Sequence, residues 1–584
     1  MATANNEVAT LLRELADLTK LEDGSSQSFR VRAYERAVDA VRSLSDDISG
    51  MSVAEMRAEE GIGESTAKKI REYLDTGTIG KLDELRAEYP PSLRELTKIP
   101  GLGPKTVLLV RSELGVESVD DLRQAIAAER LRELPGLGAT SEEKIGRAIE
   151  RLGLHGKDRR TPIIEVLPVA EQVVAALREV PGVAAVRYCG SLRRFRETIA
   201  DVDVLVASDE GHLAAESFRS LPLVDEVIAA GDTKSAILTS SGLQVDLRVV
   251  APEQWGAATL YFTGSKEHNI ALRQRAIDRG WLLNEYALAD AETESVIASE
   301  TEEEIYEALD LSPIPAPLRE ARGEIEAAEE GMLPDLVTVE DIRGDLHVHS
   351  TWSGDGRSTL DEMVAAAADR GLEYIAITEH GEDLPINGLS RQQVLDERKE
   401  LERLRVEHDE LTILHGAELN IARDGGLDYD DDFLAGYDWC VASVHSHFDL
   451  PEKAQTKRVI TAMQHPAVNV IGHLTGRRIG RRPGIELDLD AVFAAAVETK
   501  TALEINCHLD RLDVPADMLV LARDVEDLVF VISTDAHHTV EYGNIRWGVL
   551  NSQRGWVDKT QVANTWPRRR FLEWVASPEK TVLA

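Results

Sequence analysis

The chain has 584 residues, of which 43% are hydrophobic, and its formal net charge is −39 at pH 7. A chain of this length is too long for one hydrophobic core, so we expect roughly three to five domains. No apolar run approaches the ~18–20 residues that span a bilayer, and three scattered cysteines suit neither a disulfide framework nor a Cys-based zinc site, so we expect a cytoplasmic protein without membrane contact.

The negative charge bears on the partners of the protein. Binding to phosphates normally calls for a basic surface, so one interpretation is a protein that avoids nucleic acid. Arg also outnumbers Lys about threefold. An acidic surface poor in Lys is similar to proteins of a salt-loaded cytoplasm, where the Debye length falls to ~3 Å near 1 M salt. The other interpretation is therefore a halophilic protein, of haloarchaeal type, that contacts DNA through a few local sites.

Residues 1 to about 160 are predicted to be helical. Apolar residues recur at helical spacing over 7–21, 29–44 and 53–58. Three Gly-x-Gly turns, each followed by a helical stretch, contain Gly61, Gly63, Gly101, Gly103, Gly136 and Gly138. These turns resemble helix-hairpin-helix motifs, in which glycines let the N–H groups of a helix N-terminus approach a DNA phosphate. Each turn alone also fits an ordinary helix–helix connection.

From 162 to about 332 the pattern mixes helices and strands. Gly190 and Ser191 open a turn after an apolar run, and Asp201 and Asp203 share one face of the Val- and Leu-rich strand that follows. Asp246 lies in the alternating strand 243–250, where an unpaired charge would be costly. Three carboxylates on adjacent strands suit two divalent ions and a triphosphate. For an Asp-x-Asp alone, a solvated edge strand is the alternative.

These residues resemble the nucleotidyltransferase signature of the family X DNA polymerases, the family of DNA polymerase beta. The match continues through Gly231-Asp-Thr-Lys-Ser235 and Tyr261-Phe-Thr-Gly-Ser-Lys-Glu-His-Asn269. The resemblance implies that the three carboxylates are catalytic and bind Mg²⁺ or Mn²⁺. It assigns nucleotide binding to Gly190, Ser191, Arg194, Tyr261, Phe262, Gly264, Asn269 and Arg273. Phe195 and Ala200 stand where this family often has Gly, which bears on the fit of the nucleotide.

The same resemblance extends to one lysine of the N-terminal region. Thr66-Ala-Lys-Lys-Ile70 is similar to the segment that carries the lyase lysine of DNA polymerase beta, which would be Lys69. A solvated Lys on a helix face is the alternative. At the other end of this region, the acidic segment 302–330 is broken by prolines, and we interpret it as the end of a thumb followed by a linker.

Short apolar strands alternate with helical stretches from residue 344 onward. We expect seven strands, over 345–349, 374–378, 412–418, 439–445, 468–473, 502–506 and 529–534, in a closed parallel barrel related to the TIM fold. Nine potential metal ligands lie at or just after the carboxyl ends of six of these strands, namely His347, His349, Asp355, His380, Glu418, His445, His473, Asp535 and His537. Such a set suits three divalent ions, Zn²⁺ or Mn²⁺.

This segment resembles the polymerase and histidinol phosphatase (PHP) domain that follows the polymerase core in bacterial and archaeal family X enzymes. Three positions depart from that pattern: Ser353-Gly-Asp-Gly356 has an extra Gly before Asp355, Glu379 replaces an Asp, and Asn420 stands where an Asp is common. The likeness implies hydrolysis of phosphoesters by metal-activated water. Arg477, Arg478, Arg481 and Arg482 are candidates for DNA phosphate contact, with a solvated loop as the alternative.

The predicted fold is an all-α helix-hairpin-helix N-terminal region, an α+β nucleotidyltransferase palm and thumb, and a C-terminal distorted (β/α)7 barrel. The predicted domains are 1–85 (8 kDa-like), 86–160 (fingers-like), 161–260 (palm), 261–332 (thumb and linker) and 341–584 (PHP). The predicted protein is a monomeric DNA polymerase that fills gapped or nicked DNA with dNTPs and has 3′–5′ exonuclease and 3′-phosphatase activity. The alternatives are a metal-dependent nuclease or phosphatase whose polymerase-like part only binds DNA ends, and a non-catalytic scaffold at DNA breaks.

Overall fold

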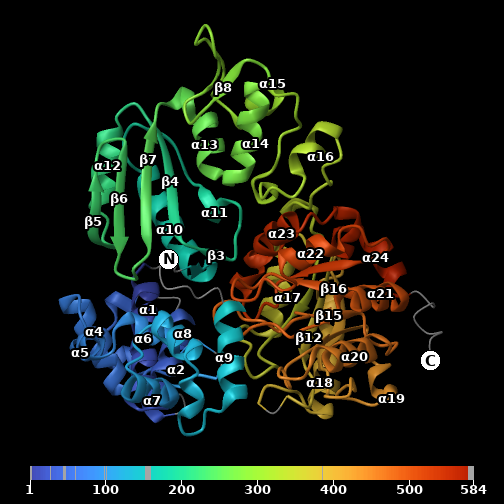
Figure 1. Cartoon of the computed structure of the whole chain (residues 1–584). Coiled ribbons are helices and arrows are strands. Elements are labelled where there is room, and N and C mark those ends of the chain that lie inside the picture. The colour runs from blue at the N-terminus through green and yellow to red at the C-terminus, as the bar shows by residue number, and fades with distance from the viewer. Residues whose placement is uncertain are drawn as a thin grey trace. The chain divides into compact units, whose positions relative to one another are not determined.

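The computed structural model describes residues 3–25, 28–43, 48–59, 61–97, 99, 101–151, 160–384 and 386–576. The chain forms two compact units, one of Met1–Arg160 with Gly480–Pro483 and the other of Thr161–Ile479 with Gly484–Ala584 (Figure 1). Among the described residues, no helix is both long enough and apolar enough to cross a membrane.

The N-terminal unit is helical and shares one hydrophobic core. Its helices are α1 (Thr3–Glu22), α2 (Phe29–Ser43), α3 (Val53–Met56), α4 (Glu64–Thr76), α5 (Gly80–Glu88), α6 (Pro91–Leu96), α7 (Pro104–Leu114), α8 (Val119–Ala127) and α9 (Ala139–Arg151). The helices predicted over 7–21, 29–44 and 53–58 correspond to α1, α2 and α3, although residue 44 lies outside the described residues.

The three Gly-x-Gly turns have a common backbone geometry. The first glycine of each pair is left-handed, with φ of +97° at Gly61, +91° at Gly101 and +83° at Gly136, a region that favours glycine. Gly63 and Gly103 are the N-caps of α4 and α7, and neither supplies a side-chain cap. The first-turn N–H groups of these helices therefore receive no side-chain cap from Gly63 or Gly103, an arrangement that favours anion binding at a helix N-terminus.

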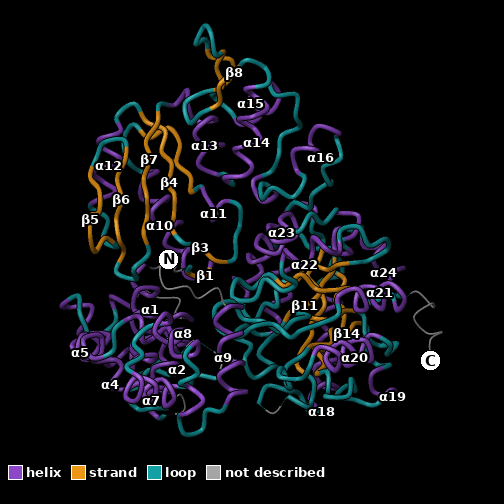
Figure 2. Tube along the Cα trace, viewed as in Figure 1, coloured by secondary structure: helices purple, strands orange, loops and turns teal. Residues whose placement is uncertain are grey.

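The second unit begins with the palm sheet, a five-stranded sheet in the order β2-β4-β7-β6-β5 (Figure 2). Its strands are β2 (Val183–Tyr188), β4 (Asp201–Ser208), β5 (Val224–Ala230), β6 (Lys234–Thr239) and β7 (Gln244–Val250). Helices α10 (Ile163–Arg178) and α12 (Gly211–Arg219) contact this sheet and each other, so they cover one face. The short strands β1 (Thr161–Pro162) and β3 (Thr198–Ile199) pair with each other.

The sequence pattern predicts a helix over 169–177, which excludes Pro168, a residue that usually favours the first turn of a helix. The helix instead begins at Ile163, and Ile163, Val166 and Leu167 are buried. The apolar face of the first turns packs in the core of the sheet, and this tertiary packing outweighs the local preference of proline.

A helical and β-hairpin segment follows the palm sheet. It contains α13 (Trp255–Thr263), α14 (Lys266–Ile277), the antiparallel strands β8 (Trp281–Leu283), β9 (Leu288–Asp290) and β10 (Val296–Ala298), and the helices α15 (Glu302–Ala308) and α16 (Glu324–Glu330). Its core is separate from that of the sheet and contains the buried side chains of Leu272, Tyr306 and Leu318.

The C-terminal region is a seven-stranded parallel barrel with its strands in chain order (Figure 1). They are β11 (Gly344–Val348), β12 (Tyr374–His380), β13 (Thr412–Asn420), β14 (Trp439–Ser443), β15 (Val470–Gly472), β16 (Ala502–Asn506) and β17 (Phe530–Ser533). The helices between and after them are α17 (Leu360–Asp369), α18 (Arg391–Glu407), α19 (Asp431–Leu434), α20 (Glu452–Met463), α21 (Leu489–Thr499), α22 (Ala516–Ala522), α23 (Ile545–Arg554) and α24 (Arg568–Val575). A parallel bridge between Val348 and Ala536 links the last strand to the first, so the barrel is nearly closed, as predicted.

Candidate active sites

The three palm carboxylates meet on one face of the sheet. Strands β4 and β7 are parallel neighbours, and Asp203 is paired in register with Asp246. Strand residues two apart point to the same face, so Asp201 joins them. The alternating positions Val202 and Val204 belong to the core under the opposite face. The sequence therefore placed these carboxylates correctly on adjacent strands.

Gly190 makes this arrangement possible. It begins a one-turn helix, α11 (Gly190–Arg193), where the sequence predicted only a turn, and its φ is +59°. A Cβ atom added at Gly190 would lie 2.4 Å from Oδ2 of Asp203, closer than real Cβ contacts allow. Only a residue without a side chain lets the backbone approach the carboxylate this closely.

The electrostatics of the palm site favour a bound cation. Burial raises the pKa of Asp203, and the nearby charges of Asp201 and Asp246 add to this, so that the pKa reaches about 7. Arg248 and Arg194 act in the opposite direction. Carboxylates this close repel each other unless a positive charge lies between them, and oxygen ligands of this kind suit Mg²⁺ or Mn²⁺.

The aromatic residues predicted to border the nucleotide lie on the same face as the carboxylates. Phe262 packs beside Leu205, which alternates with Val204 and so shares the face of Asp203. The guanidinium of Arg248 lies 5.4 Å from the centre of the Phe262 ring. Tyr261 and Phe262 are in edge contact, with ring centres 5.2 Å apart.

The remaining predicted nucleotide residues belong to α11 and to the segment after α13. Ser191 is half-buried in α11, next to Gly190. Gly264 ends α13, and its backbone lies against the guanidinium of Arg194. Asn269 Nδ2 donates a hydrogen bond to the Tyr261 carbonyl at 2.7 Å. Arg273, one turn farther along α14, is exposed.

The predicted lyase residue lies on α4 in the N-terminal unit. Lys69 Nζ donates to Ser65 Oγ at 2.9 Å and lies 5.9 Å from the centre of the Tyr34 ring. Burial lowers the pKa of Lys69, and Lys81 and Arg30 lower it further, although Glu72 opposes them. A lowered pKa is what an amine nucleophile requires, so the environment is compatible with that role.

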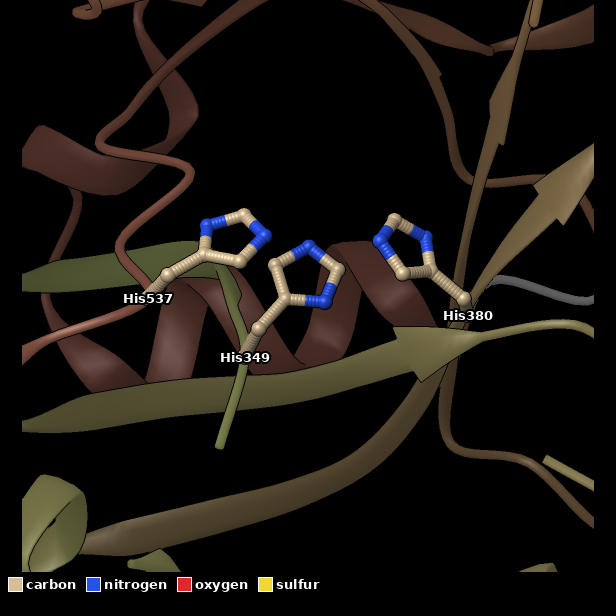
Figure 3. Close-up of side chains that lie close together, drawn as sticks. All are labelled: His349, His380 and His537. Carbon is tan, nitrogen blue, oxygen red and sulfur yellow. The ribbon is translucent and has the colours of Figure 1, made fainter. Parts of the chain in front are cut away.

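The barrel mouth gathers the predicted metal ligands. Among the described residues, three groups place nitrogen and oxygen atoms within 4.8 Å of one another: His349, His380 and His537; His347, His349 and Glu418; and Glu418, His445 and His473. Figure 3 shows the rings of the first group side by side, each from a different part of the chain. His380 is the last residue of β12, rather than one that follows the strand as predicted.

Carboxylates join these groups into one centre. Glu418 Oε1 lies 2.9 Å from His473 Nε2 and 3.1 Å from His445 Nε2. Its other oxygen lies 2.8 Å from His380 Nδ1. Asp355 Oδ2 lies 3.3 Å from His380 Nε2 and 3.6 Å from His537 Nε2. Glu418 therefore sits between the groups, while Asp355 closes the side of His380.

Asp535 completes the set of nine. Its Oδ1 lies 3.4 Å from His349 Nε2 and 3.7 Å from His347 Nε2. All nine predicted ligands thus belong to one connected cluster at the carboxyl ends of the strands. This is the position at which barrels of this kind carry their chemistry.

The buried imidazole nitrogens show that the site fits metal ions. Among the described residues, His347 Nε2 and His349 Nδ1 and Nε2 are buried without a hydrogen-bond partner. Burial lowers the pKa of His349 to about 3, assisted by His537 and His380, so its ring is neutral. Buried imidazole nitrogens without partners, next to buried carboxylates, form a donor set that suits divalent metal ions.

Three residues that support the ligands were not predicted. Glu504 Oε1 lies 2.6 Å from His347 Nδ1, and Glu504 Oε2 accepts a hydrogen bond from the backbone N–H of His473 at 2.6 Å. Asn420 Oδ1 lies 2.7 Å from His445 Nδ1. Glu379 accepts hydrogen bonds from Ser350 and Ser353, which fixes the loop before Asp355. Such partners orient the ligating rings.

Two of the four arginines proposed for phosphate contact are committed to protein groups. Arg477 donates to the carbonyl oxygens of Arg511 and Leu512, each at 2.7 Å, and pairs with Glu197. Arg478 pairs with Asp510. These contacts hold the two side chains against the protein.

Comparison with known protein families finds matches to four segments of the chain. Family models match at 3–79 (helix-hairpin-helix domain), 93–151 (SAM-like helix-hairpin-helix tandem), 258–320 (DNA polymerase beta thumb) and 345–508 (PHP domain).

Individual relatives share different parts of the chain. The DNA polymerase/3′-5′ exonuclease PolX of Bacillus subtilis is 37% identical over 562 residues, which are 96% of this chain and 97% of that protein. DNA polymerase lambda of Rattus norvegicus is 27% identical over 342 residues, 53% of this chain and 55% of that protein. A probable phosphatase of Syntrophotalea carbinolica is 35% identical over 168 residues, 28% of this chain and 64% of that protein.

Proposed function

Because the chain belongs to the family of the DNA polymerase/3′-5′ exonuclease PolX, the family X DNA polymerases with a PHP domain, we propose that it fills short gaps during DNA repair and degrades or dephosphorylates DNA 3′ ends. One observation carries this proposal. The chain has two separate clusters of potential metal ligands, the palm carboxylates and the nine-residue barrel cluster.

In the palm, we assign Asp201 and Asp203 to both metal ions and Asp246 to the ion nearer the primer 3′-OH. Arg194 and Ser191 would hold the triphosphate, and Tyr261 and Phe262 would border its sugar. Mg²⁺ or Mn²⁺ in the palm and Zn²⁺ or Mn²⁺ in the barrel would, when bound, activate the attacking hydroxyl or water and neutralise the phosphate. The carboxylates supply oxygen ligands on a rigid sheet, and Gly190 lets the backbone approach them.

In the barrel, the nine ligands would hold three ions, and Glu504 and Asn420 would fix the ring orientations of His347 and His445. The helix-hairpin-helix glycines would offer backbone N–H groups to DNA phosphates, which requires little positive charge. This explains how an acidic chain reaches DNA. We further propose that the protein is a monomer, uses dNTPs, works in the cytoplasm and is adapted to high salt.

The domain limits of the sequence analysis form part of this proposal. They are 1–85 and 86–160 for the helical regions, 161–260 for the palm, 261–332 for the thumb and linker, and 341–584 for the PHP domain. A second candidate function is lyase activity with Lys69 as the nucleophile, because the lowered pKa of Lys69 favours the free amine.

The test uses gapped DNA with a 5′-labelled primer, with and without dNTPs and with Mg²⁺ or Mn²⁺. Asp246→Asn is expected to abolish extension and leave 3′ degradation near the wild-type rate. His347→Ala with His349→Ala is expected to do the reverse and to lower the bound metal measured by elemental analysis. If both activities disappear together in folded variants, the two-site model is wrong. A wild-type protein that never extends the primer would favour a nuclease with a polymerase-like DNA grip.

A further inference from the structure

The palm loop of residues 194–197 packs against the PHP domain. The ring of Phe195 stacks on Trp547 of α23, with ring centres 5.8 Å apart and planes 12° apart. One residue after Arg196, Glu197 lies 2.7 Å from Arg477 Nη2. The loop that carries Arg194 is therefore fixed on one side by the polymerase core and on the other by the PHP domain.

Arg194 is held through two of its hydrogen-bond donors. Its Nε donates to Glu320 Oε1 at 2.9 Å, and its Nη1 donates to the carbonyl oxygen of Thr263. A guanidinium has five N–H donors in a rigid fork. These two contacts orient the fork and leave the other donors for a further acceptor. Arg194 is the C-cap of the one-turn helix α11, whose first residue, Gly190, has its backbone against the Asp203 carboxylate.

Glu320 is held within the polymerase core by Arg196, whose Nη1 lies 2.8 Å from Glu320 Oε2, and it is also held by the PHP domain. Arg554, the last residue of α23, donates from Nη1 to Glu320 Oε1 at 2.9 Å, and the same nitrogen lies 3.4 Å from the Arg194 carbonyl oxygen. The side chains of Arg554 and Glu320 are only 7% and 8% exposed. Burial raises the pKa of Glu320, but Arg554, Arg194 and Arg196 together lower it to about 2, so the carboxylate is ionised.

We propose that Arg554 and Glu320 are positioning residues for DNA synthesis: Arg554 of the PHP domain fixes Glu320, and Glu320 holds Arg194 ready for the triphosphate of the incoming nucleotide. This inference rests on the proposed function, which assigns the triphosphate to Arg194. Glu320 occupies the Nε side of Arg194, so a triphosphate does not need to displace it. A PHP-domain residue that is no metal ligand thus sets the nucleotide affinity of the polymerase site.

The experiment measures KM and kcat for dNTP in gap filling, together with 3′ degradation, on the full-length protein. Arg554→Met is expected to raise the KM for dNTP about tenfold, which corresponds to the loss of one charged hydrogen bond, with kcat and 3′ degradation near wild type. Arg554→Lys keeps the charge, and its KM for dNTP is expected to lie between those of the wild type and Arg554→Met. Asp517→Asn is the matched control, because it breaks the ion pair with Arg322, another contact of the PHP domain, without touching Glu320.

A double mutant separates this inference from the proposed function. If Arg554 acts through Arg194, then Arg554→Met has no further effect on KM in the Arg194→Ala background. If Arg194→Ala itself leaves KM unchanged, the assignment of Arg194 to the triphosphate is wrong. If Arg194→Ala raises KM and Arg554→Met does not, the positioning proposal is overturned. If Arg554→Met also loses 3′ degradation, that variant is misfolded, and Arg554→Lys is measured in its place. A KM for dNTP in Arg554→Lys equal to that of the wild type and of the Asp517→Asn control would then count against the proposal.

Discussion

Replacing Gly190 with alanine tests the geometry of the palm site at its tightest point. The added Cβ would lie 2.4 Å from Asp203 Oδ2, whereas real Cβ atoms keep at least 3.0 Å from such neighbours. The carboxylate or the backbone must therefore shift by about 0.6 Å, which exceeds the roughly 0.2 Å within which metal–ligand distances hold. An ångström-scale misplacement of a reacting group costs about 100-fold in rate. We expect Gly190→Ala to slow gap filling by about that factor.

The backbone strain of this change needs its own control. Alanine in the left-handed region costs about 1–2 kcal/mol wherever it is placed. Gly182, in the turn before β2, has φ of +81°, but a Cβ there would meet only ordinary contacts, the nearest at 3.6 Å from Glu210. Gly182→Ala therefore carries the same strain without contacting a palm carboxylate, and we expect it to retain synthesis within about threefold of wild type.

The assay is single-turnover extension of a gapped primer, with 3′ degradation by the same protein as an internal measure of folding. Gly190→Ala should lose synthesis and keep degradation, because the barrel cluster does not contact Gly190. The reasoning fails if Gly190→Ala, folded and active in degradation, extends the primer as fast as Gly182→Ala does. That result would mean that Asp203 does not need its present position.

Two further predictions concern pH and salt. Burial raises the pKa of Glu302, but Arg319 and Arg193 lower it to about 2. The ionised carboxylate therefore stabilises the folded state above about pH 4.5. As the pH falls from there toward 2, its contribution to the free energy of unfolding decreases by about 1.4 kcal/mol per pH unit. Glu302→Gln should therefore lower the thermal midpoint at pH 7 and approach wild type near pH 3, whereas a constant difference would contradict this. Gap filling and DNA binding should persist from about 0.1 to about 2 M KCl, because screening of the −39 charge offsets lost counterion release. An optimum near ~0.1 M with a steep decline above it would exclude salt adaptation.

The palm site shows what local sequence predicts well. A period of two placed Asp201 and Asp203 on one face, and the alternation in 243–250 placed Asp246 on a strand, because both signals depend only on strand geometry. The pairing of β4 with β7 is a long-range contact that periodicity does not contain, and the sequence analysis assumed it when it placed the three carboxylates on adjacent strands. The close approach of Gly190 to Asp203 was not predicted from the sequence either, because it depends on how two backbone segments are placed relative to each other.

In the barrel, the positions of the predicted ligands could be read from the sequence, whereas the residues that support them could not. The predicted ligands lie near or after the carboxyl ends of apolar strands, and this position is visible in the sequence. Glu504 lies on β16, the one predicted strand without a predicted ligand, and its only signal was a charged residue inside a buried strand. Parallel strands buried on both faces are mostly apolar, so a Glu there indicates a partner inside the barrel, which is His347.

The departure from the family pattern at Phe195 is explained by the contact that its ring makes with the PHP domain. Its φ is +55°, a conformation that favours the glycine common at this position and costs an aromatic residue about 1–2 kcal/mol. The side chain is only 3% exposed and stacks on Trp547, and burying a Phe side chain contributes roughly 1.5–3 kcal/mol. Burial therefore offsets the backbone cost. The ring also belongs to the core below the sheet, opposite Asp203, so it does not fill the nucleotide site. The Phe195 ring thus adds an apolar contact between the loop of Arg194 and the PHP domain that a glycine at this position would lack.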